Sequence, residues 1–125
     1  MALKLLIADD NPDDARLVVR EVKRAGFTVE WQRVDEESDF ARELPGVDLV
    51  ICDFSMPKFS PFRALEVIRE SRLATPLLLV SGDVSEDSAN AIISLGAVGY
   101  VLKDRLDRLG QAVSDALAGT TKPAA

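Results

Sequence analysis

Acidic residues, one hydroxyl and one lysine directly follow apolar segments that have the composition of short β-strands. They are Asp9, Asp10, Asp53, Ser81 and Lys103, and they follow the segments 3–8, 47–52, 76–80 and 98–102. Because the carboxyl ends of parallel strands meet at one edge of an open α/β sheet, we expect these side chains to converge. Three carboxylates, a hydroxyl and an ammonium in one place are the groups that bind a divalent cation and a phosphoryl group.

The chemistry of such a site follows from its charges. Neighbouring carboxylates cannot all stay ionised unless a cation compensates them. Mg²⁺, or Mn²⁺ in its place, is the expected ion because it takes few protein carboxylates and pairs with phosphoryl oxygens. Asp53 would then be a nucleophile that forms an acyl phosphate. Lys103 and Ser81 would bind the phosphoryl oxygens.

Two other functions for the same residues fit the sequence less well than phosphoryl acceptance does. A flavin or nucleotide site needs a phosphate-binding loop after the first strand, whereas here the loop 9–14 carries four acidic residues and repels phosphate. A metal-dependent phosphatase with an aspartyl nucleophile usually has a second acid two residues later, where this chain has Ser55. The pattern therefore favours a site that accepts a phosphoryl group over one that turns over substrates.

Composition limits the class of protein. The chain has 125 residues, of which 47% are hydrophobic, which suits one soluble domain. Its net charge of −6 argues against direct nucleic-acid binding, and the absence of histidine excludes His-based catalysis and imidazole zinc sites. The start lacks the pattern of a signal peptide and no apolar run is long enough for a membrane span, so we expect a cytoplasmic location. The single Cys52 is expected to be a buried strand thiol.

Strand-like and helical segments alternate five times along the chain. The strand-like segments are 3–8, 27–34, 47–52, 76–80 and 98–102, and the helical segments are 12–25, 35–44, 61–72, 85–95 and 106–117. Short apolar strands between helices predict an α/β fold with a parallel sheet covered on both faces. We therefore expect a flavodoxin-like, doubly wound (βα)5 domain over residues 1–118, with strand order 2-1-3-4-5. Residues 119–125 are expected to be a flexible tail or the start of a linker.

Four pieces of sequence, in this order, resemble one known family over nearly the full length of the chain. They are Asp9-Asp10, Asp53–Pro57, Val80–Gly82 and Tyr100–Lys103. This pattern is similar to that of the response-regulator receiver domains of two-component signalling, the CheY-like superfamily.

The resemblance implies a role for each residue of the site. Asp53 would accept a phosphoryl group from a sensor histidine kinase or a histidine phosphotransfer protein. The resemblance implies that Mg²⁺ is bound by Asp10, Asp53 and the backbone carbonyl of Ser55, with Asp9 acting through water. It also implies that Ser81 and Lys103 bind the phosphoryl group, that Tyr100 is the aromatic residue of a conformational switch, and that Ser55 and Asp83 tune the lifetime of the aspartyl phosphate.

The resemblance also implies the output. Phosphorylation would change the face formed by the fourth helix, the strand 98–102 and the last helix, and this face would contact an output domain or protein. Receivers often form homodimers through the same face. Such a domain is a phospho-acceptor and not an enzyme, apart from self-phosphorylation by small donors and autodephosphorylation. Both a stand-alone receiver and a segment of a larger regulator or hybrid kinase are consistent with the sequence.

Some positions depart from the family pattern. Asp104 follows Lys103 where many receivers have proline, Pro61 stands where a glycine often opens the third helix, and Ser81 replaces the commoner threonine. None of these changes removes a functional group. The alternative function is a pseudo-receiver, an interaction module that switches without phosphorylation, against which the intact site argues.

Other exposed groups have simpler interpretations. Acids near helix N-termini are commonly solvated, so Asp13, Asp14 and the acids at 35–37 are interpreted as surface residues. Leu17 lies off the core face of its helix and is a weak candidate for kinase docking.

Overall fold

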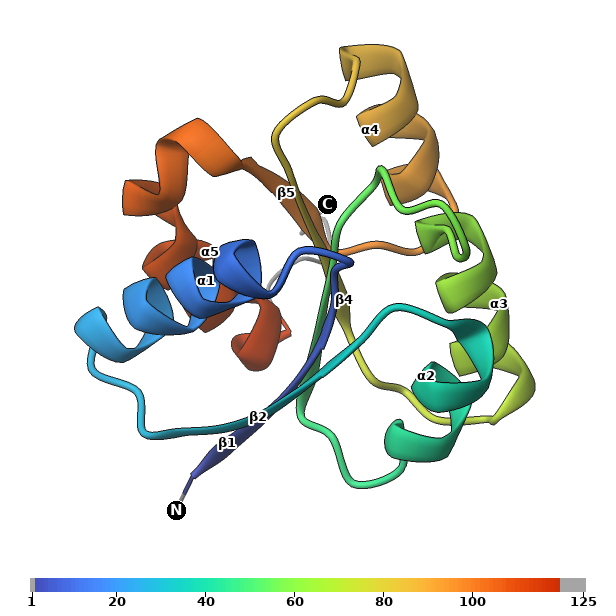
Figure 1. Cartoon of the computed structure of the whole chain (residues 1–125), viewed down its shortest axis with the longest axis horizontal. Helices are drawn as coiled ribbons and strands as arrows, with labels where there is room; N and C mark the ends of the chain where they lie inside the picture. Colours follow the sequence, from blue (N-terminus) through green and yellow to red (C-terminus); the bar gives the residue numbers. More distant parts are fainter. Residues whose placement is uncertain (1, 120–125) are drawn as a thin grey trace.

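The structure is a computed structural model that describes residues 2–119 (Figure 1). Strands and helices alternate along the chain. In chain order the elements are β1 Leu3–Ala8, α1 Pro12–Arg24, β2 Val29–Val34, α2 Glu37–Glu43, β3 Leu49–Cys52, α3 Pro61–Glu70, β4 Leu77–Ser81, α4 Glu86–Ser94, β5 Gly99–Leu102, a 3₁₀ helix Lys103–Arg108, and α5 Leu109–Ala118.

The five strands form one parallel sheet in the order β2-β1-β3-β4-β5, which confirms the predicted flavodoxin-like topology. The order reverses between β1 and β3, which are neighbours although the β2 strand separates them in sequence. Leu5 pairs with Leu49 and Ala8 with Cys52, so these two strands end at the same level. The switch point of such a sheet is where ligands bind in this architecture.

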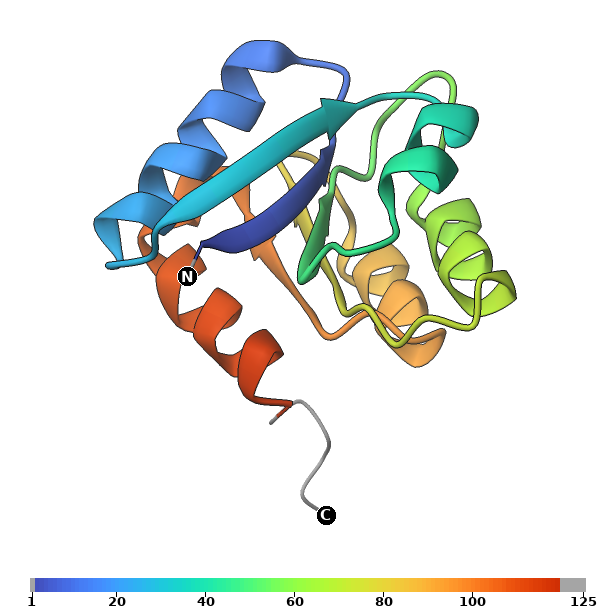
Figure 2. The ribbon, with the colours of Figure 1, turned by 90° about the horizontal axis from the view of Figure 1, so that it is seen from below.

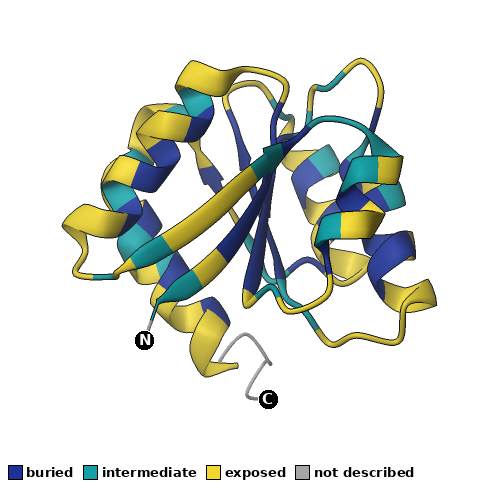
Figure 3. Cartoon of the chain, turned by 60° about the horizontal axis from the view of Figure 1, so that its bottom comes forward, coloured by how far each residue is buried: buried dark blue, intermediate teal, exposed yellow. Residues whose placement is uncertain are grey.

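Helices cover both faces of the sheet, with α1 and α5 on one side and α2, α3 and α4 on the other (Figures 1 and 2). The period-2 alternation of strand side chains divides the core accordingly. In β1, Leu5 and Ile7 pack toward α1 and α5, whereas Leu6 and Ala8 pack toward the other three helices. The central strands are buried along both faces, and the edge strand β2 is largely exposed (Figure 3). This explains why the central strands read as continuous apolar runs.

Cap residues determine where the longer helices begin. The Asn11 side chain accepts hydrogen bonds from the backbone of α1, and Pro12 occupies the first turn. Ser60 and Pro61 repeat this arrangement at α3, and the Ser85 side chain caps α4. These caps hold the loops that follow β1, β3 and β4 in defined positions beside the sheet edge.

The last helix differs from the prediction. The chain forms a 3₁₀ helix directly after Lys103, and α5 begins only at Leu109. The spacing of Leu106, Leu109, Val113 and Leu117 predicts the core stripe of this helix. In the structure, however, Leu117 is 39% exposed and Ala116 is buried instead. The physical reason is periodicity: relative to Leu109, position 116 returns to the core face, whereas position 117 lies about 80° round the helix.

A close helix contact joins α1 to α5. A Cβ atom added at Gly110 would lie 2.6 Å from the Cβ of Ala25, so only glycine permits this approach. Gly119 ends α5 in the left-handed conformation with a φ of 71°. The remainder of the predicted tail, 120–125, lies outside the described residues. None of the helices within residues 2–119 has the length and hydrophobicity needed to cross a bilayer.

Candidate functional site

Backbone hydrogen bonds extend the sheet past the ends of its strands and place the acidic residues side by side. The Asp9 amide donates to the Val34 carbonyl at 3.0 Å, and the Asp53 amide donates to the Ala8 carbonyl at 2.8 Å. Asp53 is therefore held beside the end of β1 by the same ladder that pairs β1 with β3. The apolar runs before both acids bury these positions, because the strands lie in the middle of the sheet.

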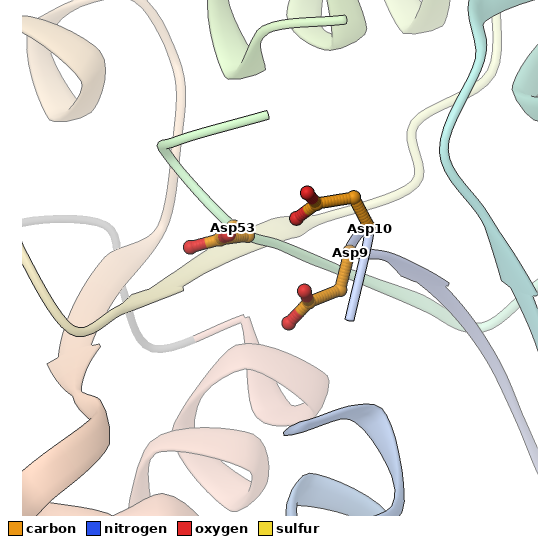
Figure 4. Close-up of side chains that lie close together, drawn as sticks. All are labelled: Asp9, Asp10 and Asp53. Carbon is orange, nitrogen blue, oxygen red and sulfur yellow. The ribbon is translucent and has the colours of Figure 1, made fainter. Parts of the chain in front are cut away.

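The carboxylates of Asp9, Asp10 and Asp53 gather at this edge. Each offers an oxygen within 4.8 Å of the others (Figure 4). Asp9 and Asp53 are 2% and 7% exposed, whereas Asp10 faces solvent. Within the part of the chain that the structure describes, the buried polar residues are Asp9, Asp53 and Ser81. The predicted convergence of the acidic residues is thus present.

Lys103 enters the same cluster from the end of β5. Its Nζ lies 3.0 Å from Asp9 Oδ2, 2.8 Å from Asp14 Oδ2 and 3.7 Å from Asp53 Oδ1. The interpretation of Asp14 as a solvated surface acid is therefore wrong, because its side chain is 33% exposed and pairs with the lysine. Asp13 does match that interpretation, with an exposed side chain that pairs with Arg16.

The electrostatics of the cluster follow from burial and from Lys103. Burial raises the pKa of Asp53 above its ordinary value, and the neighbouring Asp9 adds to this, while Lys103, Ser81 and the Phe54 amide oppose it. Burial disfavours the charged lysine, but hydrogen bonds to Asp14 and Asp9 outweigh it and raise the pKa of Lys103. The Lys103 charge is therefore firmly held, and Asp53 remains costly to ionise.

The remaining predicted site residues lie at different distances from this centre. Ser81 is 1% exposed, and the Asp83 amide donates to its hydroxyl at 3.4 Å. Ser55 and Asp83 are exposed on the loops after β3 and β4. Tyr100 is 38% exposed on β5 and lines a cavity of about 650 Å³ with residues of α5. The structure thus brings Ser81 to the acidic cluster and leaves the Tyr100 ring at the surface.

The donor set suits a hard divalent cation. The carboxylate of Asp10 makes no hydrogen bond or ion pair with any residue of the described range 2–119, so it is free to bind a metal ion. Both oxygens of Asp9 are engaged, one by the Asn11 amide at 3.0 Å and the other by Lys103. This agrees with the expectation that Asp9 acts through water, because direct ligation would cost it one of these bonds. Oxygen ligands of this kind are those that Mg²⁺ prefers.

Three further residues singled out in the sequence lie outside the acidic cluster. Cys52 is buried in β3, and burial raises the pKa of its thiol, so it is not a nucleophile. Asp104, expected near the lysine, is exposed and does not pair with Lys103. Leu17 is 40% exposed on α1, so its side chain is accessible to a partner.

Comparisons with known proteins agree with this geometry. The family model of the response regulator receiver domain matches residues 5–114. Among curated relatives, the cell cycle transcriptional regulator CtrA of Caulobacter vibrioides is 25% identical over 101 residues, covering 81% of this chain and 44% of CtrA. The autoinducer 2 sensor kinase/phosphatase LuxQ of Vibrio vulnificus is 26% identical over 102 residues, covering 81% of this chain and 12% of LuxQ. The chain thus spans less than half the length of these relatives.

Solved structures have the same fold. The receiver domain of the putative response regulator NarL from Mycobacterium tuberculosis superposes with a TM-score of 0.81 at 24% identity, covering 94% of this chain and 98% of that one. The receiver domain of a putative LuxO repressor protein from Vibrio parahaemolyticus gives a TM-score of 0.81 at 23% identity, covering 95% and 92%.

The chain belongs to the response regulator receiver domain family. Receiver domains are signalling domains of two-component systems that interact with histidine kinases and output domains, and they bind Mg²⁺ at an acidic pocket. In this chain the acidic residues Asp9, Asp10 and Asp53 lie together and could hold a metal ion.

Proposed function

We propose that this domain accepts a phosphoryl group on Asp53 from the phosphohistidine of a sensor histidine kinase or histidine phosphotransfer protein. The observation that carries this proposal is the placement of Asp53. Its carboxylate is 8% exposed, lies beside two other carboxylates, and has the Lys103 ammonium 3.7 Å from one oxygen. A buried carboxylate that lies beside two other carboxylates and a fixed cation has the neighbours that a phosphoryl acceptor needs.

The transfer balances as a displacement at phosphorus. A carboxylate oxygen of Asp53 attacks the phosphorus atom, and the phosphorus–nitrogen bond of the donor breaks. The imidazole nitrogen keeps the electron pair and takes a proton from solvent. Mg²⁺, held by Asp10, Asp53 and the carbonyl of Ser55, would neutralise charge on the phosphoryl oxygens. Asp9 would hold a water molecule of that ion.

The phosphoryl group adds a charge of about −1.5 to −2 next to Lys103 and Ser81. Lys103 would bind one of its oxygens through Nζ, and the Ser81 hydroxyl would donate to another. Movement of Ser81 would let Tyr100 turn inward and so change the face formed by α4, β5 and α5. Inverting a 1:99 population of two states requires a bias of about 5.5 kcal/mol between them.

The output side of the proposal concerns partners and lifetime. The α4-β5-α5 face would bind an output domain or protein and would be the contact of any homodimer. Ser55 and Asp83, which are exposed on the loops after β3 and β4, would tune the hydrolysis of the aspartyl phosphate. The functional unit would be residues 1–118, with 119–125 as a tail or linker start, whether the domain acts alone or within a longer regulator.

The direct test is intact mass after incubation with acetyl phosphate, with and without Mg²⁺. We expect a Mg²⁺-dependent gain of one phosphoryl group that is lost in the Asp53→Asn variant. Beryllofluoride binding, followed by NMR, detects an acceptor site whose phosphate is lost too quickly for mass measurement. Failure of both would contradict the proposal and leave the pseudo-receiver as the better description.

A further inference from the structure

Lys103 is shared among three carboxylates, and the nearest of them is not the proposed phosphoryl acceptor. The Nζ atom lies 2.8 Å from Asp14, 3.0 Å from Asp9 and 3.7 Å from Asp53. The first two distances are those of charge-assisted hydrogen bonds, whereas the third is an ion pair without a hydrogen bond. In this state Asp14 and Asp9 therefore hold the ammonium, and Asp53 receives only its field.

Asp14 is fixed in this position by the start of α1. Its backbone amide donates to the Asn11 side chain at 3.3 Å, so the first helical turn presents the carboxylate to the end of β5. The lysine and Asp14 side chains are 19% and 33% exposed, so water screens their pairing only in part. The adjacent Asp13 is 87% exposed and pairs with Arg16, away from the lysine.

A phosphoryl group on Asp53 would need the same ammonium. Lys103 has three N–H donors, and two of them are already used by Asp14 and Asp9. The third N–H is left for a phosphoryl oxygen, and the negative charge of that group would draw Nζ away from Asp14 and weaken the bond between them. The free energy of the Asp14 bond therefore opposes phosphoryl binding.

We propose that Asp14 is a positioning residue that holds Lys103 in the unphosphorylated state and competes with the phosphoryl group on Asp53 for it. This inference rests on the proposed function of Asp53. Its consequence is a weaker response. Part of the free energy that Lys103 gains by binding the phosphoryl group is offset by the weakening of its bond to Asp14. Removing the Asp14 carboxylate should strengthen binding of a phosphoryl mimic.

The experiment is a titration with beryllofluoride at saturating Mg²⁺, comparing Asp14→Asn with the unsubstituted protein. We expect the variant to bind about two- to fivefold more tightly, which is the upper part of the range for losing one competing, partly screened charge pair. Asp13→Asn is the matched control, because it removes the same charge from the neighbouring position of the same helix without touching Lys103. Asp14→Glu restores a carboxylate and should return the affinity toward that of the unsubstituted protein.

The outcomes separate the inference from the proposed function. Equal affinities for Asp14→Asn and Asp13→Asn would overturn the inference, because a general charge effect would then explain both, while the function of Asp53 would stand. Weaker binding by Asp14→Asn would also overturn it. No beryllofluoride binding by the unsubstituted protein would contradict the proposed function and the inference together. Tighter binding confined to Asp14→Asn and reversed in Asp14→Glu would support it.

Discussion

Two clusters in this molecule each join one basic side chain to three carboxylates, but one cluster is largely buried and the other is exposed. Lys103 lies among Asp9, Asp14 and Asp53 at the edge of the sheet, at 2.8–3.7 Å. Arg63 lies among three glutamates on the surface of α2 and α3, which are Glu37, Glu66 and Glu70 at 2.9–3.3 Å. Each cluster joins one cation to three carboxylates, so a count of ion pairs would rate them equally.

Burial separates the two clusters. The glutamates around Arg63 are 44–64% exposed, so water can replace the arginine at little cost. The Asp9 and Asp53 side chains are 4% and 8% exposed, so they depend on Lys103 for compensation. We therefore expect the Lys103 cluster to contribute to both stability and function, whereas the Arg63 cluster should contribute little beyond linking two helices.

The largest effect is expected from Lys103→Met. It leaves two buried carboxylates without their cation, and breaking a buried pair in this way costs about 3 kcal/mol. Urea unfolding at pH 7 without divalent ions measures this loss. Because the folded-state pKa of Lys103 is raised, its contribution is present below the ordinary pKa of about 10.4 and lost as pH rises through the folded value. An unchanged urea midpoint would show that solvent already reaches these carboxylates.

Mg²⁺ should have the next largest effect, because on the proposed function it would bind the folded acidic cluster and not the unfolded chain. At ten times its dissociation constant it should raise the free energy of unfolding by about 1.4 kcal/mol. The Asp10→Asn variant should lose most of this gain, since Asp10 is the carboxylate that no neighbour occupies. Thermal unfolding with and without Mg²⁺ measures it, and equal gains in the two proteins would remove Asp10 from the metal site.

Asp53→Asn should stabilise the protein at pH 7 when no divalent ion is present, because it removes a carboxylate that burial makes costly to ionise. The raised pKa of Asp53 means that its contribution to stability is present below about 3.9 and lost as pH rises through the folded value. The advantage of the variant should therefore grow with pH and shrink when Mg²⁺ is added. A variant less stable than the unsubstituted protein at pH 7 would contradict this account.

The smallest effect is expected from Arg63→Met, the counterpart of Lys103→Met. Its ion pairs are exposed and screened by salt, so the urea midpoint should change little and beryllofluoride binding not at all. A loss of unfolding free energy as large as that of Lys103→Met would contradict this account, because the contribution of each cluster to stability would then not depend on its exposure.

Much of the site follows from the sequence because it is tied to strand ends. Asp9, Asp53, Ser81 and Lys103 each follow an apolar run, and in a parallel sheet such positions share one edge whatever the details of the helices. The order of the strands in the sheet could also be predicted, because five short β/α units admit few arrangements.

Side-chain direction is the part that composition does not reveal. Asp13 and Asp14 are identical in type and adjacent, and both suit a helix N-terminus. Asp14 belongs to the site only because Lys103, 89 residues later in the sequence, lies beside it in the fold. Asp13 has no such neighbour within residues 2–119 and is a surface acid. The start of α5 at Leu109 is likewise not evident from the sequence, because the spacing of Leu106 and Leu109 does not distinguish an α-helix from the 3₁₀ helix that the chain forms over residues 103–108.

The ion pair between Asp9 and Lys103 spans 94 residues of sequence, which has a consequence for a chain that is still being made. At rates of synthesis of 5–20 residues per second, the ribosome needs about 5–20 s to pass from Asp9 to Lys103. For the last 50 residues of that interval the acceptor Asp53 already exists, but its cation does not. On the proposed function, a nascent chain is therefore a poor substrate for a kinase, and competence to receive a signal arises only when β5 joins the sheet.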